Sequence, residues 1–182
     1  MLPLPAPTGG PPEELVDAAV DMAGGNPYLL EQMLRTYISS GTLVPREGAP
    51  WDVDLDRLDD AQLPLSVEDA IAARIASLTP PERTLLEMAA VVGGVFWLGA
   101  LVALGRHDKK PPALWGGVED IAAHYRDLLA GLADRDYVLP MPDASMAGDE
   151  EYAFKHNLER ERLYALTSAS TLKRFHRRFA EW

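Results

Sequence analysis

The 182-residue sequence contains no cysteine, which excludes disulfides, thiolate zinc sites and cysteine nucleophiles. It has no apolar run near the ~20 residues of a membrane-spanning helix, and residues 1–12 lack the basic start and apolar centre of a signal peptide. It contains neither the G-x-x-x-x-G-K-[S/T] loop that cradles phosphates nor the G-x-S-x-G turn of serine hydrolases. We therefore expect a cytoplasmic chain with no membrane contact and no catalysis of its own.

Basic residues are scarce, with 17 Lys and Arg against 28 Asp and Glu, a net charge of −11. The imbalance lies in residues 1–90, which carry 15 acidic and 5 basic side chains, whereas residues 91–182 carry 13 and 12. From residue 155 onward the balance reverses to 7 basic and 3 acidic. The acidic body disfavours broad nucleic-acid binding. The basic end either docks on an acidic partner or is simply solvated.

Metal-binding patterns are also missing. Four histidines occur without metal-ligand spacing: His107, His124, His156 and His176. The segment 54–62 is rich in aspartate but lacks the glycine and the terminal glutamate of a calcium loop. We interpret it as a solvated acidic connector and expect no metal site.

Apolar spacing indicates a mostly α-helical chain. Helical patterns occupy the stretches 13–22, 27–38, 67–78, 80–92, 96–104, 117–134, 158–166 and 172–182. Their apolar stripes place Met22, Met33 and Met88 in the core, and Ser66 with Asp69 resembles a helix cap. Strand-like runs at 42–44 and 51–53 predict a short hairpin, and those at 137–139 and 152–154 predict a second one.

The order of these elements predicts two subdomains. Three helices followed by a two-stranded hairpin is the order of a winged helix. We therefore expect a linker over 1–12, a helical subdomain with a short hairpin over 13–62, and a winged-helix-like domain over 63–166. Residues 167–182 then begin a further helical region, and their apolar stripe stops in mid-pattern, which suggests a longer parent chain. The polar segment 105–117 is expected to be a loop.

The stretch 23–28, Ala-Gly-Gly-Asn-Pro-Tyr, separates the first two helices. Gly24 and Gly25 can adopt positive φ to end one helix, and Pro27 suits the first position of the next. These residues alone leave two interpretations open: a plain helix joint, or a turn that also contacts a ligand.

Several short sequence motifs occur in a fixed order along most of the chain. They are the residues at 23–31, 41–43, 63–64, 73–78, 82–93, 152–158, 164 and 175–182. Together they resemble the segment that follows the P-loop core in bacterial signal-transduction ATPases of the STAND class, which are relatives of AAA proteins. The segment 105–117 contains none of these motifs.

The resemblance implies a regulatory fragment: a helical lid and a winged helix that close over nucleotide and sense it. An ATPase core holding ATP or ADP with magnesium would precede this chain, helical repeats would follow it, and effector domains or proteins would be further partners. A Gly-x-Pro turn of the family lid lies against the base, which corresponds to Gly25, Asn26 and Pro27. The winged helix supplies a histidine to the terminal phosphate of ADP. His156 takes that place, although Lys155 and Asn157 replace the Met and Asp that flank it in related ATPases.

Three alternatives stay open. His156 can instead cap the helix that follows it. The chain can be a DNA-binding winged-helix regulator that uses its basic end, although the expected recognition helix, 117–134, carries four acidic residues and only Arg126 as a basic one. The third alternative is a plain protein-interaction scaffold.

Overall fold

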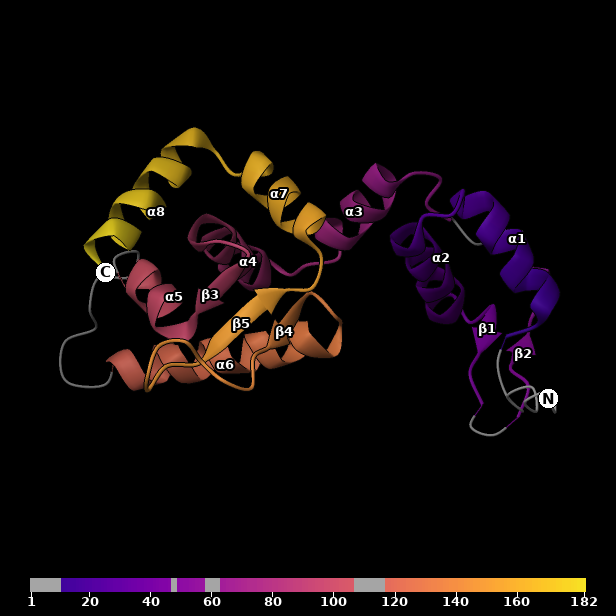
Figure 1. Ribbon diagram of the computed structural model, residues 1–182, viewed down its shortest axis with the longest axis horizontal. Coiled ribbons are helices and arrows are strands. Elements are labelled where there is room, and N and C mark those ends of the chain that lie inside the picture. The colour runs from indigo at the N-terminus through magenta and orange to yellow at the C-terminus, as the bar shows by residue number, and fades with distance from the viewer. Residues whose placement is uncertain (1–10, 47–48, 58–62, 107–116) are drawn as a thin grey trace, which may run out of the picture. The chain divides into compact units, whose positions relative to one another are not determined.

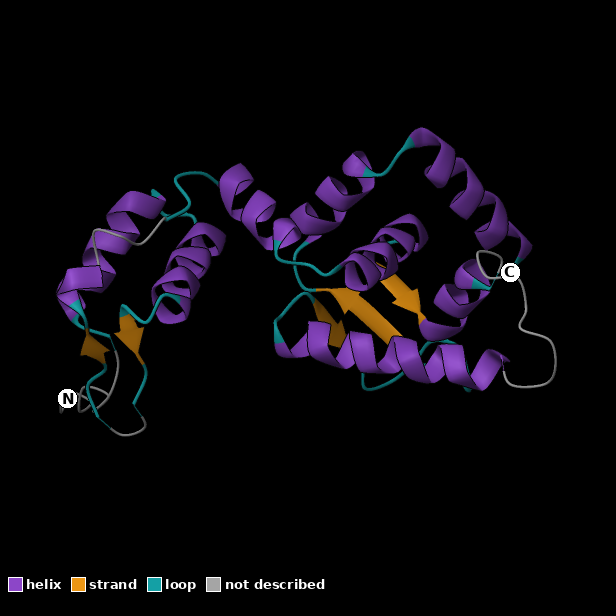
Figure 2. Cartoon of the chain, turned by 180° about the vertical axis from the view of Figure 1, so that it is seen from behind, coloured by secondary structure: helices purple, strands orange, loops and turns teal. Residues whose placement is uncertain are grey.

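A computed structural model describes residues 11–46, 49–57, 63–106 and 117–182, which form eight α-helices, one short 3-10 helix and five strands (Figures 1 and 2). The described chain is therefore mostly helical, as predicted, with two small antiparallel sheets. It divides into two units, Met1–Arg74 and Ile75–Trp182, and each is described by itself. The expected subdomain boundary at residue 62 stays a prediction.

The first unit is built on a pair of helices. These are α1 (Glu13–Ala23) and α2 (Pro27–Ser39). They contact one another, and α2 also contacts β1 (Leu43–Val44). That strand pairs antiparallel with β2 (Asp52–Val53), which confirms the first predicted hairpin. A 3-10 helix, η1 (Leu55–Arg57), lies at the start of the predicted acidic connector, and residues 58–62 are outside the described part.

Helix α3 (Val67–Ala76) begins where its cap was predicted. The Asp69 backbone N–H donates to the Ser66 hydroxyl at 3.1 Å, and that hydroxyl donates to the Asp69 carboxylate at 2.8 Å. A short joint, residues 77–79, separates α3 from α4 (Pro80–Val92). At the start of α4, the Glu82 carboxylate accepts from the Thr79 backbone N–H at 2.9 Å. Both starts satisfy N–H groups that a helix leaves without an internal partner.

The second unit surrounds α4, which contacts four other helices. After α4 the order is β3 (Val95–Trp97), α5 (Leu98–Gly105), α6 (Gly117–Asp134), β4 (Val138–Pro140), β5 (Glu151–Phe154), α7 (Asn157–Leu166) and α8 (Ala169–Glu181). The strands form one antiparallel sheet in the order β3-β5-β4, so β5 is central. Val95 and Leu139 both pair with Ala153. In Figure 1, α7 and α8 follow one another along α4, which both contact.

Aromatic and aliphatic side chains fill the core between this sheet and the helices. Phe96 is fully buried, and its ring centroid lies 5.9 Å from that of Tyr152 and 5.5 Å from that of Phe154. The largest buried residues of the helices around it are Leu85, Leu86, Met88, Leu101, Leu104, Leu129, Leu132, Leu163 and Phe175. Helix α6 has the bounds predicted from its apolar stripe.

Two local predictions are wrong. The apolar stretch 96–104 was expected to be one helix, but Val95–Trp97 forms β3, because three β-favouring side chains find a partner strand in β5. Met22 was expected in the core, yet it is 49% exposed. The buried residues of α1 are Ala19 and Ala23, so this helix packs through its small side chains and the stripe is rotated away from Met22. Most of the expected loop 105–117, residues 107–116, lies outside the described part.

The start of α5 provides a stability test. The Gly99 backbone N–H donates to both carboxylate oxygens of Asp149, at 3.0 and 3.2 Å, and a methyl group at Gly99 would collide with that carboxylate. We expect Gly99→Ala to destabilise the second unit by about 1–3 kcal/mol in urea unfolding. The matched control is Gly131→Ala inside α6, where an added Cβ meets nothing within 4 Å. It should stabilise by about 0.5–1 kcal/mol. Equal effects of the two changes would contradict this assignment.

Candidate functional site

Gly25, Asn26 and Pro27 lie together in the turn between α1 and α2. Gly24 and Gly25 have φ of +57° and +79°, so both adopt the left-handed conformation predicted for them. Pro27 is the first residue of α2, also as predicted, and is exposed to solvent. A Cβ added at either glycine meets nothing within 4 Å. The glycines are therefore required by backbone conformation and not by close packing.

Asn26 caps α2, a role that the sequence analysis missed. Its side-chain Oδ1 accepts from the backbone N–H groups of Tyr28 at 3.1 Å and Leu29 at 3.2 Å. An asparagine directly before a proline at a helix start is a known signal for this cap. The cap occupies two of the N–H groups with which a helix N-terminus would bind a phosphate. What the turn offers to a ligand is therefore the exposed Pro27 ring.

His156 lies at the other end of the chain, between β5 and α7. It holds the N-cap position of α7, but its side chain makes no capping hydrogen bond. The alternative that its ring caps this helix is therefore not what the structure shows. The ring is half-buried, and its Nε2 atom is fully buried.

The two residues beside His156 have partners within the chain. Lys155 Nζ lies 3.1 Å from the carboxylate of Asp136. The Asn157 side-chain amide donates to Glu161 at 2.6 Å and accepts from Arg160 Nε at 2.8 Å. The ammonium of Lys155 thus already contacts an oxyanion, and a phosphate would compete for it with the Asp136 carboxylate.

Strand β5, which leads into His156, is anchored at its start by Glu151. The Glu151 carboxylate accepts from the Ser145 backbone N–H at 2.6 Å, from the Ser145 hydroxyl at 2.5 Å and from Trp97 Nε1 at 2.9 Å. The hydrogen bonds from Ser145, aided by Trp97, lower the pKa of Glu151 although burial raises it. These bonds tie the β4–β5 connection to β3 and so fix the strand that carries His156.

The predicted site residues thus fall into two groups. Gly25, Asn26 and Pro27 belong to the first unit, and His156 belongs to the second. Each group is locally well defined, and the sequence prediction that both meet one nucleotide stays a prediction.

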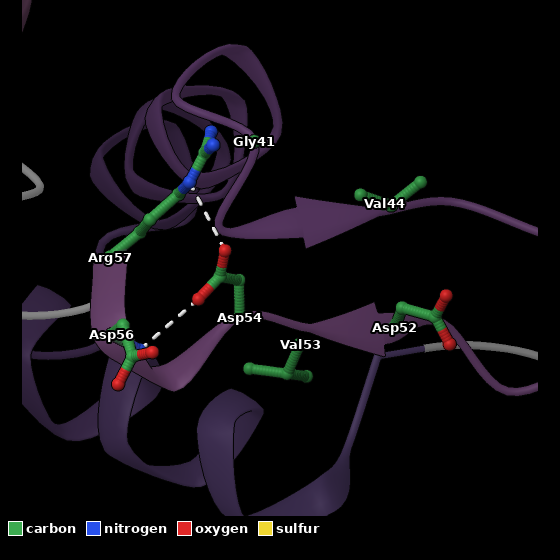
Figure 3. A pocket seen from close by; sticks show the side chains of 7 residues that line it. All are labelled: Gly41, Val44, Asp52, Val53, Asp54, Asp56 and Arg57. Atoms are coloured by element: carbon green, nitrogen blue, oxygen red, sulfur yellow. Dashed lines mark hydrogen bonds and ion pairs between the residues drawn. The ribbon is translucent and has the colours of Figure 1, made fainter.

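A shallow hollow of about 770 Å³ opens in the first unit, beside the β1–β2 hairpin (Figure 3). Its lining residues are Gly41, Val44, Asp52, Val53, Asp54, Asp56 and Arg57. Figure 3 shows the Asp54 carboxylate between two donors, Arg57 Nε at 3.1 Å and the Asp56 backbone N–H at 3.2 Å. The described residues contain no group of three or more His, Cys, Asp or Glu able to hold a metal ion, and Asp59 and Asp60 lie outside them. None of the described helices has the length and apolar character needed to cross a membrane.

Comparisons with protein-family models, curated proteins and solved structures find no match to this chain. The resemblance to STAND-class ATPases therefore depends on the short sequence motifs alone.

The Asn26 cap predicts a graded mutational series. Asn26→Ala removes the acceptor of two backbone N–H groups and should destabilise the first unit by about 1 kcal/mol. Asn26→Asp keeps the acceptor and adds a negative charge at the positive end of the helix dipole, so it should be neutral or stabilising. Thermal unfolding of the three proteins checks this order. If the alanine variant is as stable as the original chain, the side chain does not cap α2.

The lowered pKa of Glu151 predicts a pH dependence. Because this pKa is lowered in the folded chain, the ionised carboxylate contributes stability that is complete above its ordinary pKa and is lost as the pH falls through the lowered value. Urea unfolding between pH 7 and pH 3 should show this loss. Glu151→Gln should be less stable at neutral pH and should flatten this part of the profile. Glu181→Gln, on the exposed end of α8, is the matched control, because it removes a carboxylate that accepts none of the three hydrogen bonds made to Glu151. A Glu151→Gln profile with the original slope would contradict the assignment.

Proposed function

We propose that this chain is a regulatory segment of a STAND-class ATPase, in which a helical lid and a winged helix close over ATP or ADP held by a separate P-loop core. The segment would sense which nucleotide is bound and pass that state to partner domains by moving as a block. The observation that carries the proposal is the α1–α2 turn, where Pro27 is exposed at a helix start whose N–H groups are already capped.

The geometry of this turn suits a base better than a phosphate. Asn26 takes the N–H groups of Tyr28 and Leu29, which removes the usual reason for an anion to bind there. The Pro27 ring presents a flat apolar surface with no hydrogen-bond demand, and a purine can pack on it. The described geometry therefore supports Pro27 as the base contact implied by the family resemblance.

The second unit supports the winged-helix assignment. Its elements run α4, β3, α5, α6, β4 and β5, and its sheet has the order β3-β5-β4. A winged helix has three helices and a three-stranded antiparallel sheet in this order, with the wing between the last two strands. In this assignment the wing would be the connection from β4 to β5, which Glu151 and Asp149 fasten to β3 and α5.

His156 would report on the terminal phosphate. An imidazole donates to a phosphate oxygen, more strongly when it is protonated. Since Nε2 is buried, the ring must turn or use Nδ1 before such a contact forms. We infer that His156 reaches the phosphate only in one nucleotide state, which is what a sensor requires. We expect no hydrolysis by this segment itself, because the phosphate loop and its magnesium ligands belong to the P-loop core.

The DNA-binding alternative receives less support. In a winged helix the recognition helix would be α6, which carries four acidic residues and only one Lys or Arg, Arg126. Arg126 is itself paired with Glu150 at 2.5 Å. A phosphate backbone would be repelled by this helix. A plain interaction scaffold remains the third interpretation, and it predicts no nucleotide dependence.

The test uses the intact protein that contains this segment, purified with its bound nucleotide. His156→Ala should lower the retained ADP about tenfold, the loss of one charge-assisted hydrogen bond, and raise basal output activity. Pro27→Ala should lower ADP retention by roughly twofold to fivefold through lost apolar contact. ADP occupancy is measured by chromatography of the denatured protein.

Pro80→Ala is the matched control, since Pro80 is also an exposed first residue of a helix but starts α4. It should leave the ADP content unchanged. Unchanged occupancy in both His156→Ala and Pro27→Ala, or a sequence upstream of residue 1 without a P-loop, would overturn the proposal.

A further inference from the structure

Three consecutive residues between α6 and β4, Arg135 to Tyr137, contact three separate parts of the second unit. We refer to them as the 135–137 turn. Its first side chain reaches the start of α4, its second reaches Lys155 beside His156, and its third reaches the joint between α3 and α4. The turn therefore connects the candidate sensor to the segment that leads into the first unit along the chain.

Tyr137 contacts the joint directly, and Arg135 contacts it through Glu82. The Arg135 guanidinium forms an ion pair with Glu82 in the first turn of α4, and it also lies over the Tyr137 ring, 5.4 Å from its centroid. Tyr137 is 3% exposed, and its hydroxyl lies 2.9 Å from the Ser77 hydroxyl. Residues 77–79 are thus contacted at two points. Tyr137 contacts Ser77, and Glu82, the ion-pair partner of Arg135, accepts a hydrogen bond from the Thr79 backbone N–H.

Asp136 is the residue of the turn at which α6 ends. It has φ of +58°, and it is the one residue other than glycine with positive φ among the described residues. Its carboxylate pairs with Lys155, and the Lys155 backbone N–H donates to the Tyr137 carbonyl at 3.1 Å. This left-handed residue closes α6, because the Asp136 N–H donates to the Ala133 carbonyl and the Tyr137 N–H donates to the Leu132 carbonyl, both at 2.9 Å. The ion pair and the Lys155 backbone bond join this helix end to the segment between β5 and His156.

We propose that the 135–137 turn transmits the state of the Lys155–His156 site to the joint between α3 and α4. A phosphate group at this site competes with Asp136 for the Lys155 ammonium. The tie between Lys155 and the turn then weakens, the end of α6 is freer to shift, and the contacts of Tyr137 with Ser77 and of Arg135 with Glu82 loosen. The joint is firm when Lys155 is paired with Asp136 and loose when Lys155 is drawn away. The phosphate part of this inference rests on the proposed function, whereas the mechanical link does not.

The link is tested in this chain without nucleotide, by hydrogen exchange resolved at single amides. Lys155→Met removes the ammonium and keeps the apolar stem, so it imitates the loss of the ion pair. We expect the backbone amides of Leu78 and Thr79 to exchange about threefold faster. Asp136→Asn, which removes the charge but tolerates the left-handed conformation, should give the same increase.

Tyr137→Phe should also accelerate these amides, because it removes the bond to Ser77. Combined with Lys155→Met, it should give clearly less than the product of the two single effects, since both act through one path. Arg126→Met is the matched control. It breaks the ion pair with Glu150 in the same unit and should leave the joint unchanged.

The amide of Phe154, bonded to the Gly94 carbonyl at 2.9 Å, serves as the internal reference. An equal acceleration at Phe154 would mean general destabilisation and would overturn the link, as would unchanged joint amides or fully multiplicative effects. This result is independent of ADP retention in the intact protein. A failed link leaves the proposed nucleotide contact standing, and a failed nucleotide contact leaves the measured link standing.

Discussion

The packing of Phe96 against Tyr152 and Phe154 is the contact on which the second unit depends. It joins β3 to β5, two strands distant in the sequence, and it does so in a fully buried position. Truncating a buried phenylalanine costs about 3–5 kcal/mol, a large part of the stability of a domain of this size. Because β5 also pairs with β4, this contact secures the whole sheet.

The same strand positions the candidate sensor. Phe154 is held in the core, Lys155 pairs with the 135–137 turn, and His156 starts α7. The place of His156 is therefore set by core packing on one side and by an ion pair on the other. A site built in this way would be able to respond to a local charge change without loss of the fold, because Phe96 and Glu151 secure the strand elsewhere.

The residues explain which features could be predicted. The α1–α2 turn, the first hairpin and the bounds of α6 were predictable because glycine, proline and the 3.6-residue period act locally. Strand β3 was missed because three apolar residues directly before an apolar helix have no period of their own. The Asn26 cap had a sequence signal, whereas the pairing of Lys155 with Asp136 had none, since it depends on how β4 and β5 come together.

The structure shows what several basic residues from 155 onward contact, which the net charge of this segment could not show. Arg160 of α7 donates to the Ala90 carbonyl at 3.4 Å, and Arg178 of α8 donates to the Leu104 carbonyl at 2.9 Å. Both carbonyls lie in the last turns of helices, α4 and α5, where the helix dipole favours a cation. Lys155 is paired with Asp136. Two of the basic residues counted from 155 onward thus join helices of the second unit, and a third ties the start of α7 to the 135–137 turn. Each of these three already has a partner within the unit, which weakens the case that this end binds a nucleic acid.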